Sequence, residues 1–296
     1  MTRHAAVMMR GGVALVLAVV LAGGAVAGCG RLASSAGGPT SSHGQAERSI
    51  VALGDSVPHG TNCDCTPYPP LTAEAVSAVS GYPVSATNDS VSGYTSRDVV
   101  HQLDADRAVV THLGGADAVE IEVGANDVAY TDSCGTALAC YTAKIPQVEQ
   151  NLTTIVGRVH ELTGGAHVLI VLLDYWSVWL GGSYAAAQGD AYVATAQELT
   201  DAINTAIRSV ATASGSAYVD LRAAFKGPSY AYDETHYLCD DGDHPNAAGH
   251  RQIAQATSEV IETALHLGPP TVRQGFPATP ARQAGRPRVV STELWM

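Results

Sequence analysis

The segment SIVALGDS, residues 49–56, joins an apolar run to a polar turn. Residues 49–53 are mostly β-branched or apolar and are followed by Gly54, which predicts a buried strand. Asp55 and Ser56 come directly after that strand. A serine in a strand-to-helix turn can hold its hydroxyl clear of the sheet and direct its own N–H at a ligand. Taken alone, the tripeptide is more often an ordinary turn and helix N-cap.

Short apolar runs alternate with longer helical patterns on the C-terminal side of this segment. The patterns predict further strands at residues 84–88, 118–123, 168–173 and 217–221, and helices at 71–79, 145–162, 192–213 and 247–265. Such alternation is typical of an α/β domain whose parallel sheet is covered on both faces. Ligands of such sheets bind beyond the carboxyl ends of the strands.

Two of the predicted strands are followed by residues that could stabilise a negative charge. Gly93 has no side chain to keep its N–H from a ligand oxygen, and Asn126 carries an amide donor. Each residue also has an ordinary interpretation. Gly93 could be a simple loop glycine, and Asn126 with Asp127 could form an Asx turn.

A candidate base precedes the last predicted helix. A serine hydroxyl needs a base, most often a histidine whose tautomer is held by a carboxylate. Asp241 lies three residues before His244, so its carboxylate can reach the imidazole across one turn. Asp240 and Asp243 are rival carboxylates, and His236 is a rival base. The alternative is a solvated acidic loop that ends in a proline turn.

A serine, a glycine, an asparagine and an Asp/His pair in this chain order resemble the SGNH/GDSL hydrolases, over residues 54–244. The resemblance implies an α/β fold of three α/β/α layers, flavodoxin-like, around a five-stranded parallel sheet. It also implies ester hydrolysis with no cofactor and no metal. The implied catalytic residues are Ser56, Asp241 and His244, and the implied oxyanion hole is formed by Ser56, Gly93 and Asn126.

Two stretches near the implied nucleophile depart from the family pattern or are unusual. Val57-Pro58 follows the GDS tripeptide where leucine is more usual, although Pro58 fits an early helix turn. The loop Cys63-Asp64-Cys65 is unusual, so the resemblance does not define the rim of the pocket there. No Gly-x-Ser-x-Gly elbow surrounds a mid-chain serine, which argues against the α/β-hydrolase fold.

The N-terminal residues predict export. Arg3 and Arg10 accompany an apolar run, and the sequence Val26-Ala27-Gly28-Cys29 resembles a lipoprotein signal in which Cys29 is lipidated. Ordinary cleavage and an uncleaved anchor are the alternatives. The predicted organisation is a signal peptide at 1–28, a flexible tether at 29–46, the hydrolase domain at 47–266 and a disordered tail at 267–296. The protein is expected outside the cytosol, either tethered to the membrane through Cys29 or secreted.

Charge and cysteine content constrain the partners and the compartment. The net charge of −12 argues against nucleic acid and leaves a small-molecule or lipid ester as the expected partner. Export favours disulfides. Cys134 and Cys140 close a short loop and are expected to pair, and Cys239 is expected to bond either Cys63 or Cys65.

Three other functions are compatible with these residues. The same triad could transfer an acyl group to another alcohol, and a tethered protein with a dead site is also possible. A zinc site is a further alternative, formed by His236, Cys239, Asp241, Asp243 and His244. Trp176 and Trp179 could line a pocket, although packing in the core or at a rim is commoner. The acyl chain and the alcohol of the substrate are not determined by these patterns.

Overall fold

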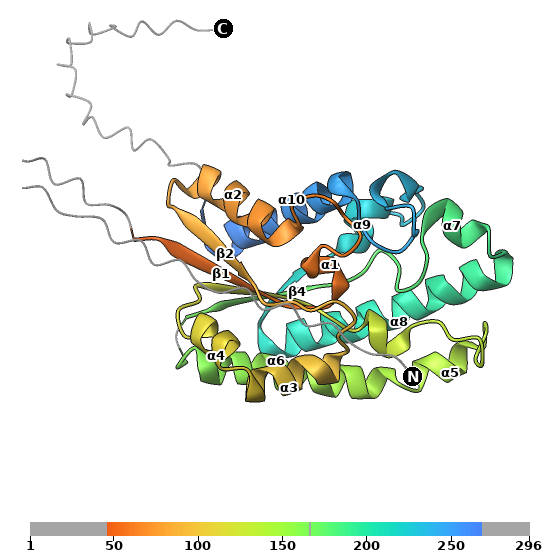
Figure 1. Ribbon diagram of the computed structural model, residues 1–296, viewed down its shortest axis with the longest axis horizontal. Helices are drawn as coiled ribbons and strands as arrows, with labels where there is room; N and C mark the ends of the chain where they lie inside the picture. Colours follow the sequence, from red (N-terminus) through yellow and green to blue (C-terminus); the bar gives the residue numbers. More distant parts are fainter. Residues whose placement is uncertain (1–45, 166, 268–296) are drawn as a thin grey trace, which may run out of the picture. The chain divides into compact units, whose positions relative to one another are not determined.

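The computed structural model describes residues 46–165 and 167–267 (Figure 1). At its centre is a five-stranded sheet in the order β2-β1-β3-β4-β5, in which every pair of neighbours is parallel. The strands are β1 (Arg48–Gly54), β2 (Val84–Asn88), β3 (Ala118–Glu122), β4 (Leu169–Leu173) and β5 (Ala217–Val219). The predicted five-stranded parallel sheet is therefore confirmed. The predicted signal peptide, almost all of the tether and the tail beyond Leu267 lie outside the described residues.

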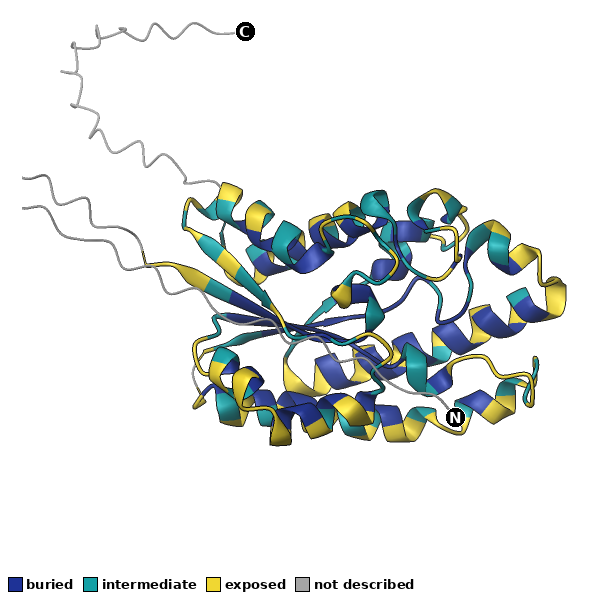
Figure 2. Ribbon diagram, viewed as in Figure 1, coloured by how far each residue is buried: buried dark blue, intermediate teal, exposed yellow. Residues whose placement is uncertain are grey.

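Long helices cover both faces of the sheet, which makes three layers (Figure 1). On one face, α2 (Tyr68–Ser80) packs against α10 (Ala247–Ala264). On the other, α6 (Ile145–Leu162) packs against both α3 (Ser96–Ala105) and α8 (Asp190–Ser214). Each helix buries the side that faces the sheet and exposes the other (Figure 2). The α/β/α arrangement agrees with the predicted fold class.

Shorter helices connect these elements. They are α1 (Ser56–His59), α4 (Arg107–Leu113), α5 (Leu138–Thr142), α7 (Gly182–Ala186) and α9 (Leu221–Lys226), with 3-10 turns η1 (Ala125–Val128) and η2 (Thr235–Tyr237). The sequence patterns predicted none of these short segments. Most of them lie at the carboxyl end of a strand or in a loop that follows one, where the candidate site residues are.

Local sequence explains where predicted and observed bounds differ. The helix predicted from residue 71 begins at Tyr68, because Pro69 and Pro70 fit its first turn. The strand predicted to residue 221 ends at Val219, because the Asp220 side chain accepts the Ala223 N–H and caps α9. Helix α3 starts at a capping box between Thr95 and Asp98.

Two carboxyl groups are fully buried on β3. Glu120 and Glu122 are both 0% exposed, and their register partners on β1 are the small residues Ala52 and Gly54, which leave room for them. Burial raises the pKa of both glutamates well above the usual value, because desolvation disfavours their charged forms.

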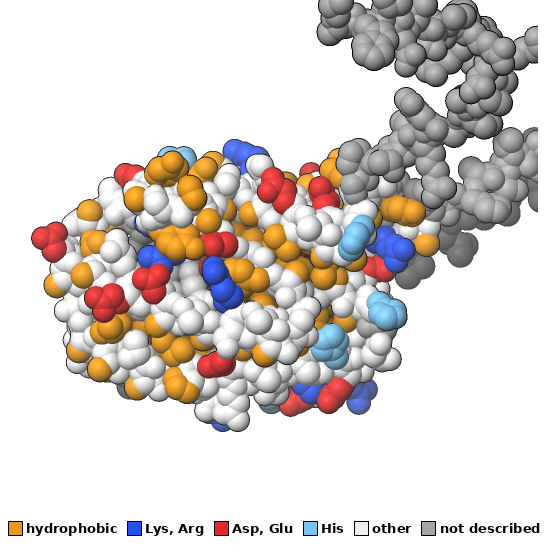
Figure 3. Space-filling model, turned by 180° about the vertical axis from the view of Figure 1, so that it is seen from behind, with side chains coloured by type: hydrophobic (Ala, Val, Ile, Leu, Met, Phe, Trp, Pro, Cys, Tyr) orange, Lys and Arg blue, Asp and Glu red, His pale blue; other side chains and the backbone are white. Residues whose placement is uncertain are grey.

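The surface of the described residues is mixed in character. On the face drawn in Figure 3, acidic, basic and apolar side chains are interspersed. Among residues 46–165 and 167–267, none of the helices is both long and apolar enough to span a bilayer.

Candidate active site

The turn after β1 presents Ser56 at the carboxyl edge of the sheet. Gly54 has φ +148°, and a Cβ there would collide with the carbonyl oxygen of Glu122, so only glycine fits. Asp55 caps α1 by accepting the Val57 N–H at 3.1 Å. Ser56 is then the first residue of α1, and Pro58 lies in the same first turn, as its fixed φ allows.

Asp55 is an anchor for this turn and is almost fully buried, at 1% exposed. Its second carboxylate oxygen accepts the hydroxyl of Tyr175 at 2.7 Å. Burial raises the pKa of Asp55 to about 7. Because Tyr175 follows β4, this hydrogen bond ties the turn that carries Ser56 to a loop far away in the sequence. The sequence patterns gave no sign of this contact.

The candidate base is held by Asp241. His244 Nδ1 lies 2.8 Å from one oxygen of Asp241, and the other oxygen accepts the N–H groups of Asp243 and His244 at 3.0 Å each. With Nδ1–H donating to the carboxylate, Nε2 is left to act as a base. Burial alone would raise the pKa of Asp241, but hydrogen bonds, chiefly from the His244 backbone and Asn62, lower it to about 2. Asp241 is therefore ionised at neutral pH.

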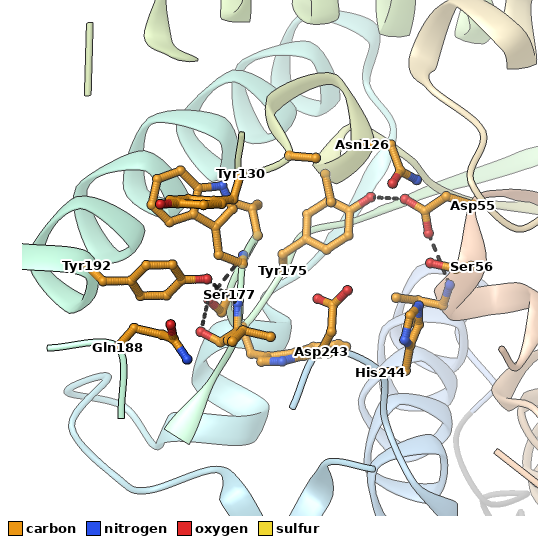
Figure 4. A pocket seen from close by; sticks show the side chains of 17 residues that line it. Asp55, Ser56, Asn126, Tyr130, Tyr175, Ser177, Gln188, Tyr192, Asp243 and His244 are labelled. Carbon is orange, nitrogen blue, oxygen red and sulfur yellow. Dashed lines mark hydrogen bonds between the residues drawn. The ribbon is translucent and has the colours of Figure 1, made fainter. Parts of the chain in front are cut away.

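The rival residues occupy other positions. Asp243 lines the cavity beside His244 and makes no hydrogen bond to the imidazole among the contacts of the described residues (Figure 4). Asp240 and His236 are exposed and do not line that cavity.

Asn126 belongs to η1, directly after β3, and lines the same cavity as Ser56 and His244 (Figure 4). Its amide donates to the Tyr94 carbonyl oxygen at 3.0 Å. The neighbouring Asp127 accepts both the N–H and the hydroxyl of Ser96 at 2.8 Å, which ties η1 to the start of α3. Asn126 and Asp127 thus make contacts across the fold, beyond those of a local Asx turn.

Gly93 is the one predicted site residue that stands apart. It is exposed, has φ +82° and is not among the residues that line the cavity. It immediately precedes Tyr94, whose carbonyl holds the Asn126 amide. The structure therefore brings Ser56, Asn126 and His244 together at one cavity and leaves Gly93 in the adjoining loop.

The cavity has a volume of about 320 Å³, and its wall includes the rings of Tyr130, Tyr175, Trp176, Trp179 and Tyr192. Tyr130 and Tyr192 flank Trp179, with ring centroids 5.2 and 5.1 Å from it. Trp176 and Trp179 are 2% and 3% exposed and also line the cavity, so they serve both packing and the pocket wall. Polar side chains come from Gln188 at the rim and from the residues beside Ser56 (Figure 4).

The cysteines pair partly as predicted. Cys134 and Cys140 form a disulfide, which confirms that expectation. The predicted bond from Cys239 is wrong, because Cys63 and Cys65 bond each other and Cys239 is a free thiol. The chain bends at Asp64, and the Cα atoms of Cys63 and Cys65 are 5.1 Å apart.

The zinc alternative predicted a different grouping from the one observed. Among the described residues, the one cluster of metal-type side chains contains Cys63, Cys65 and His250. Two of these are joined in a disulfide, which removes their thiolates as ligands. None of the five residues of the proposed zinc site belongs to this cluster.

Comparisons with known proteins bear on the family and the fold. Residues 52–252 match the model of the "GDSL-like Lipase/Acylhydrolase family". Among solved structures, a lipase from a goat rumen metagenome superposes with a TM-score of 0.60 at 17% identity, covering 72% of this chain and 97% of that one. A catalytic mutant of an acetylxylan esterase from Geobacillus stearothermophilus superposes with a TM-score of 0.53 at 21% identity, covering 72% and 94%. No curated protein sequence matches this chain.

Proposed function

Because this chain belongs to the GDSL-like lipase/acylhydrolase family and is a carboxylic ester hydrolase, we propose that Ser56 is its nucleophile and His244 its general base. The observation that most directly supports this proposal is that Ser56, Asn126 and His244 line one cavity while Asp241 holds His244 Nδ1. These are the groups that acyl transfer through a serine requires.

The proposed reaction has two halves. The Ser56 hydroxyl attacks the ester carbonyl while His244 Nε2 takes its proton and then returns it to the leaving alcohol. A water activated by His244 then releases the acid from acyl-Ser56. The Ser56 N–H, the Asn126 amide and the Gly93 N–H stabilise the oxyanion in both halves. Gly93 lies outside the cavity wall, so its share of this role requires the Gly93–Tyr94 loop to approach the substrate.

The cavity favours an uncharged acyl ester. Its aromatic walls suit an apolar acyl group or the face of a sugar ring, and Asp243 would repel an anionic substrate. Lipid, short-chain and acetylated carbohydrate esters are the classes to compare, the last because one structural neighbour is an acetylxylan esterase. Assays with and without an added alcohol acceptor separate hydrolysis from acyl transfer.

Labelling with a fluorophosphonate probe tests the nucleophile. We expect the probe to modify Ser56, as identified by peptide mass mapping, and to block hydrolysis of p-nitrophenyl esters. Ser177 lines the same cavity and provides a matched control. Ser56→Ala should lose both labelling and hydrolysis while staying folded, and Ser177→Ala should keep labelling. Near-wild-type turnover by folded Ser56→Ala would overturn the proposed mechanism.

We also propose that the mature protein is exported and held at the membrane by a lipid on Cys29. The signal-like sequence before Cys29 and the Ser/Gly/Ala-rich segment after it support this. A lipid anchor would leave the hydrolase domain free to reach substrates near the membrane surface.

A further inference from the structure

The loop that follows the nucleophile helix contacts the loop that carries the candidate base. Asn62 lies between α1 and α2, and its side-chain amide donates to Asp241 Oδ2 at 2.5 Å. The same oxygen lies 2.8 Å from His244 Nδ1. Asp241 Oδ2 therefore accepts two hydrogen bonds, one from the imidazole and one from Asn62. The mechanism above assigns no role to Asn62.

The Asn62 amide acts on the carboxylate and not on the ring. Its nitrogen also lies 3.5 Å from His244 Nδ1. With the Nδ1 proton donated to Asp241, that nitrogen has no lone pair to accept a second bond. Asn62 can thus influence His244 only by fixing the position and charge distribution of Asp241.

The backbone of Asn62 is held in an uncommon conformation. Its φ is +60°, in the left-handed region that asparagine tolerates better than most residues. The Cys239 sulfur lies 3.4 Å from the Asn62 carbonyl oxygen and equally far from that of Pro245, and the thiol can donate to either one. Before Asn62, the Thr61 N–H donates to the Ser56 carbonyl at 3.0 Å, and after it the Cys63–Cys65 disulfide closes the next turn. Asn62 is therefore restrained on both sides.

We propose that Asn62 is a positioning residue that fixes Asp241 on His244, and that the Cys63–Cys65 disulfide acts by keeping Asn62 in place. This inference rests on the proposed roles of Asp241 and His244. The two backbone N–H groups hold Asp241 Oδ1, whereas Oδ2 is held by the imidazole and by the Asn62 amide, so Asn62 is the partner that restrains Oδ2 independently of the ring. Small displacements of a catalytic base cost large factors in rate.

Two substitutions separate the effect of the Asn62 side-chain amide from the effect of the Asn62 backbone conformation. Asn62→Gly keeps access to positive φ and removes the amide, and Asn62→Asp keeps the shape but replaces the donor by a carboxylate. We expect kcat to fall by about 10- to 100-fold in both variants, with little change in KM. Asp64→Asn is the matched control, because Asp64 is exposed in the same loop and makes no contact with Asp241 among the described interactions. Its kcat should match that of the wild type.

The pH profile gives a readout that loss of stability would not move. The added carboxylate of Asn62→Asp favours the protonated imidazole, so the acid limb of kcat/KM should move to higher pH. The other titratable groups that act on His244 are Asp241, Asp55, Asp243 and His250, and they are the same in every variant. An acid limb that stays in place in Asn62→Asp would contradict the proposed contact.

A double-mutant cycle tests the disulfide. Cys63→Ser/Cys65→Ser should lower kcat in the same direction as Asn62→Gly, provided that circular dichroism shows a folded protein. If the disulfide acts through Asn62, then Asn62→Gly should cost much less in that background than in the wild type. Fully additive losses would overturn this half of the proposal.

A measurement that does not depend on turnover can show whether this inference fails separately from the proposed function. The Nδ1 proton of a histidine bonded to a carboxylate gives a downfield NMR signal, which His244→Gln would assign. We expect the signal to shift or exchange faster in Asn62→Gly and to stay unchanged in Asp64→Asn. If the wild type hydrolyses no ester, the proposed function fails, and the signal still decides the role of Asn62. An identical signal with unchanged kcat in both Asn62 variants would overturn the inference.

Discussion

One oxygen of Asp241 lies 2.8 Å from His244 Nδ1, and the other accepts the backbone N–H of the same histidine at 3.0 Å. Both contacts are made within one four-residue turn. The separation of three residues therefore sets the Asp241–His244 pairing locally. Asp243 donates its backbone N–H to Asp241 Oδ1, and among the contacts of the described residues its side chain does not hold the His244 ring.

Asp241→Asn should lower kcat by about 10²- to 10⁴-fold, because an amide no longer stabilises the imidazolium or its required tautomer. Asp243→Asn should have a much smaller effect. Steady-state kinetics on a p-nitrophenyl ester near pH 8 compares the two. If Asp243→Asn shows the larger loss, then Asp243 is the true partner of His244.

Asn126→Ala should lower kcat by about 10²-fold or more, with a smaller effect on KM, because the amide acts on the charge of the transition state. The melting temperature of the variant serves as the control, since its hydrogen bond to Tyr94 is also lost. A large loss of stability with kcat unchanged would show that Asn126 is only a structural turn residue.

Because of Asp55, the free energy of unfolding should fall as pH rises from about 4 to about 7. Burial raises its pKa to about 7 in the folded protein, whereas the unfolded carboxyl releases its proton near pH 4. Between these pH values the folded state therefore keeps the Asp55 proton that the unfolded state has lost. The stability that this proton contributes is gone once the pH passes the pKa of the folded protein. Each pKa unit corresponds to about 1.4 kcal/mol.

Asp55→Asn tests this dependence, because asparagine can still contact the Val57 N–H and the Tyr175 hydroxyl. The free energy of unfolding of the variant relative to wild type should increase between pH 5 and pH 8. Asp174, whose pKa burial also raises to about 7, leaves a similar slope in both proteins. A difference that is the same at both pH values would contradict the raised pKa of Asp55.

Tyr130→Ala should raise KM by about 3- to 10-fold, as expected for the loss of one aromatic contact, and should leave kcat nearly unchanged. Tyr130 is 41% exposed at the rim of the cavity and packs edge-on against Trp179. Tyr232, which is 63% exposed and does not line this cavity, is the matched control. Equal KM values for the two variants would place the substrate elsewhere.

Cys29→Ser should release the protein from the membrane fraction into the medium when it is expressed in the native host. The expectation follows from the predicted lipoprotein signal at residues 26–29. Fractionation followed by immunoblotting compares the variant with wild type. If both are released equally, the lipid tether does not exist.

Local periodicity predicted the five strands and a parallel sheet covered on both faces, whereas the three-layer flavodoxin-like fold was implied by the family resemblance and helix α3 was not predicted. Apolar runs identified all five strands, and β2 and α6 have the predicted bounds. The Asp241–His244 pair was also predictable, because a separation of three residues brings two side chains together within one turn. Contacts of this kind depend on nearest neighbours along the chain, which a sequence displays directly.

Tertiary structure decided the contacts between loops. Tyr175 reaches Asp55 across 120 residues, and Asn62 reaches Asp241 across 179. These contacts depend on the strand order, which places the loops after β1, β4 and β5 at one edge of the sheet. Periodicity identifies each strand but not its neighbours. The contacts around the candidate catalytic groups therefore became visible only when the packed sheet brought those loops together.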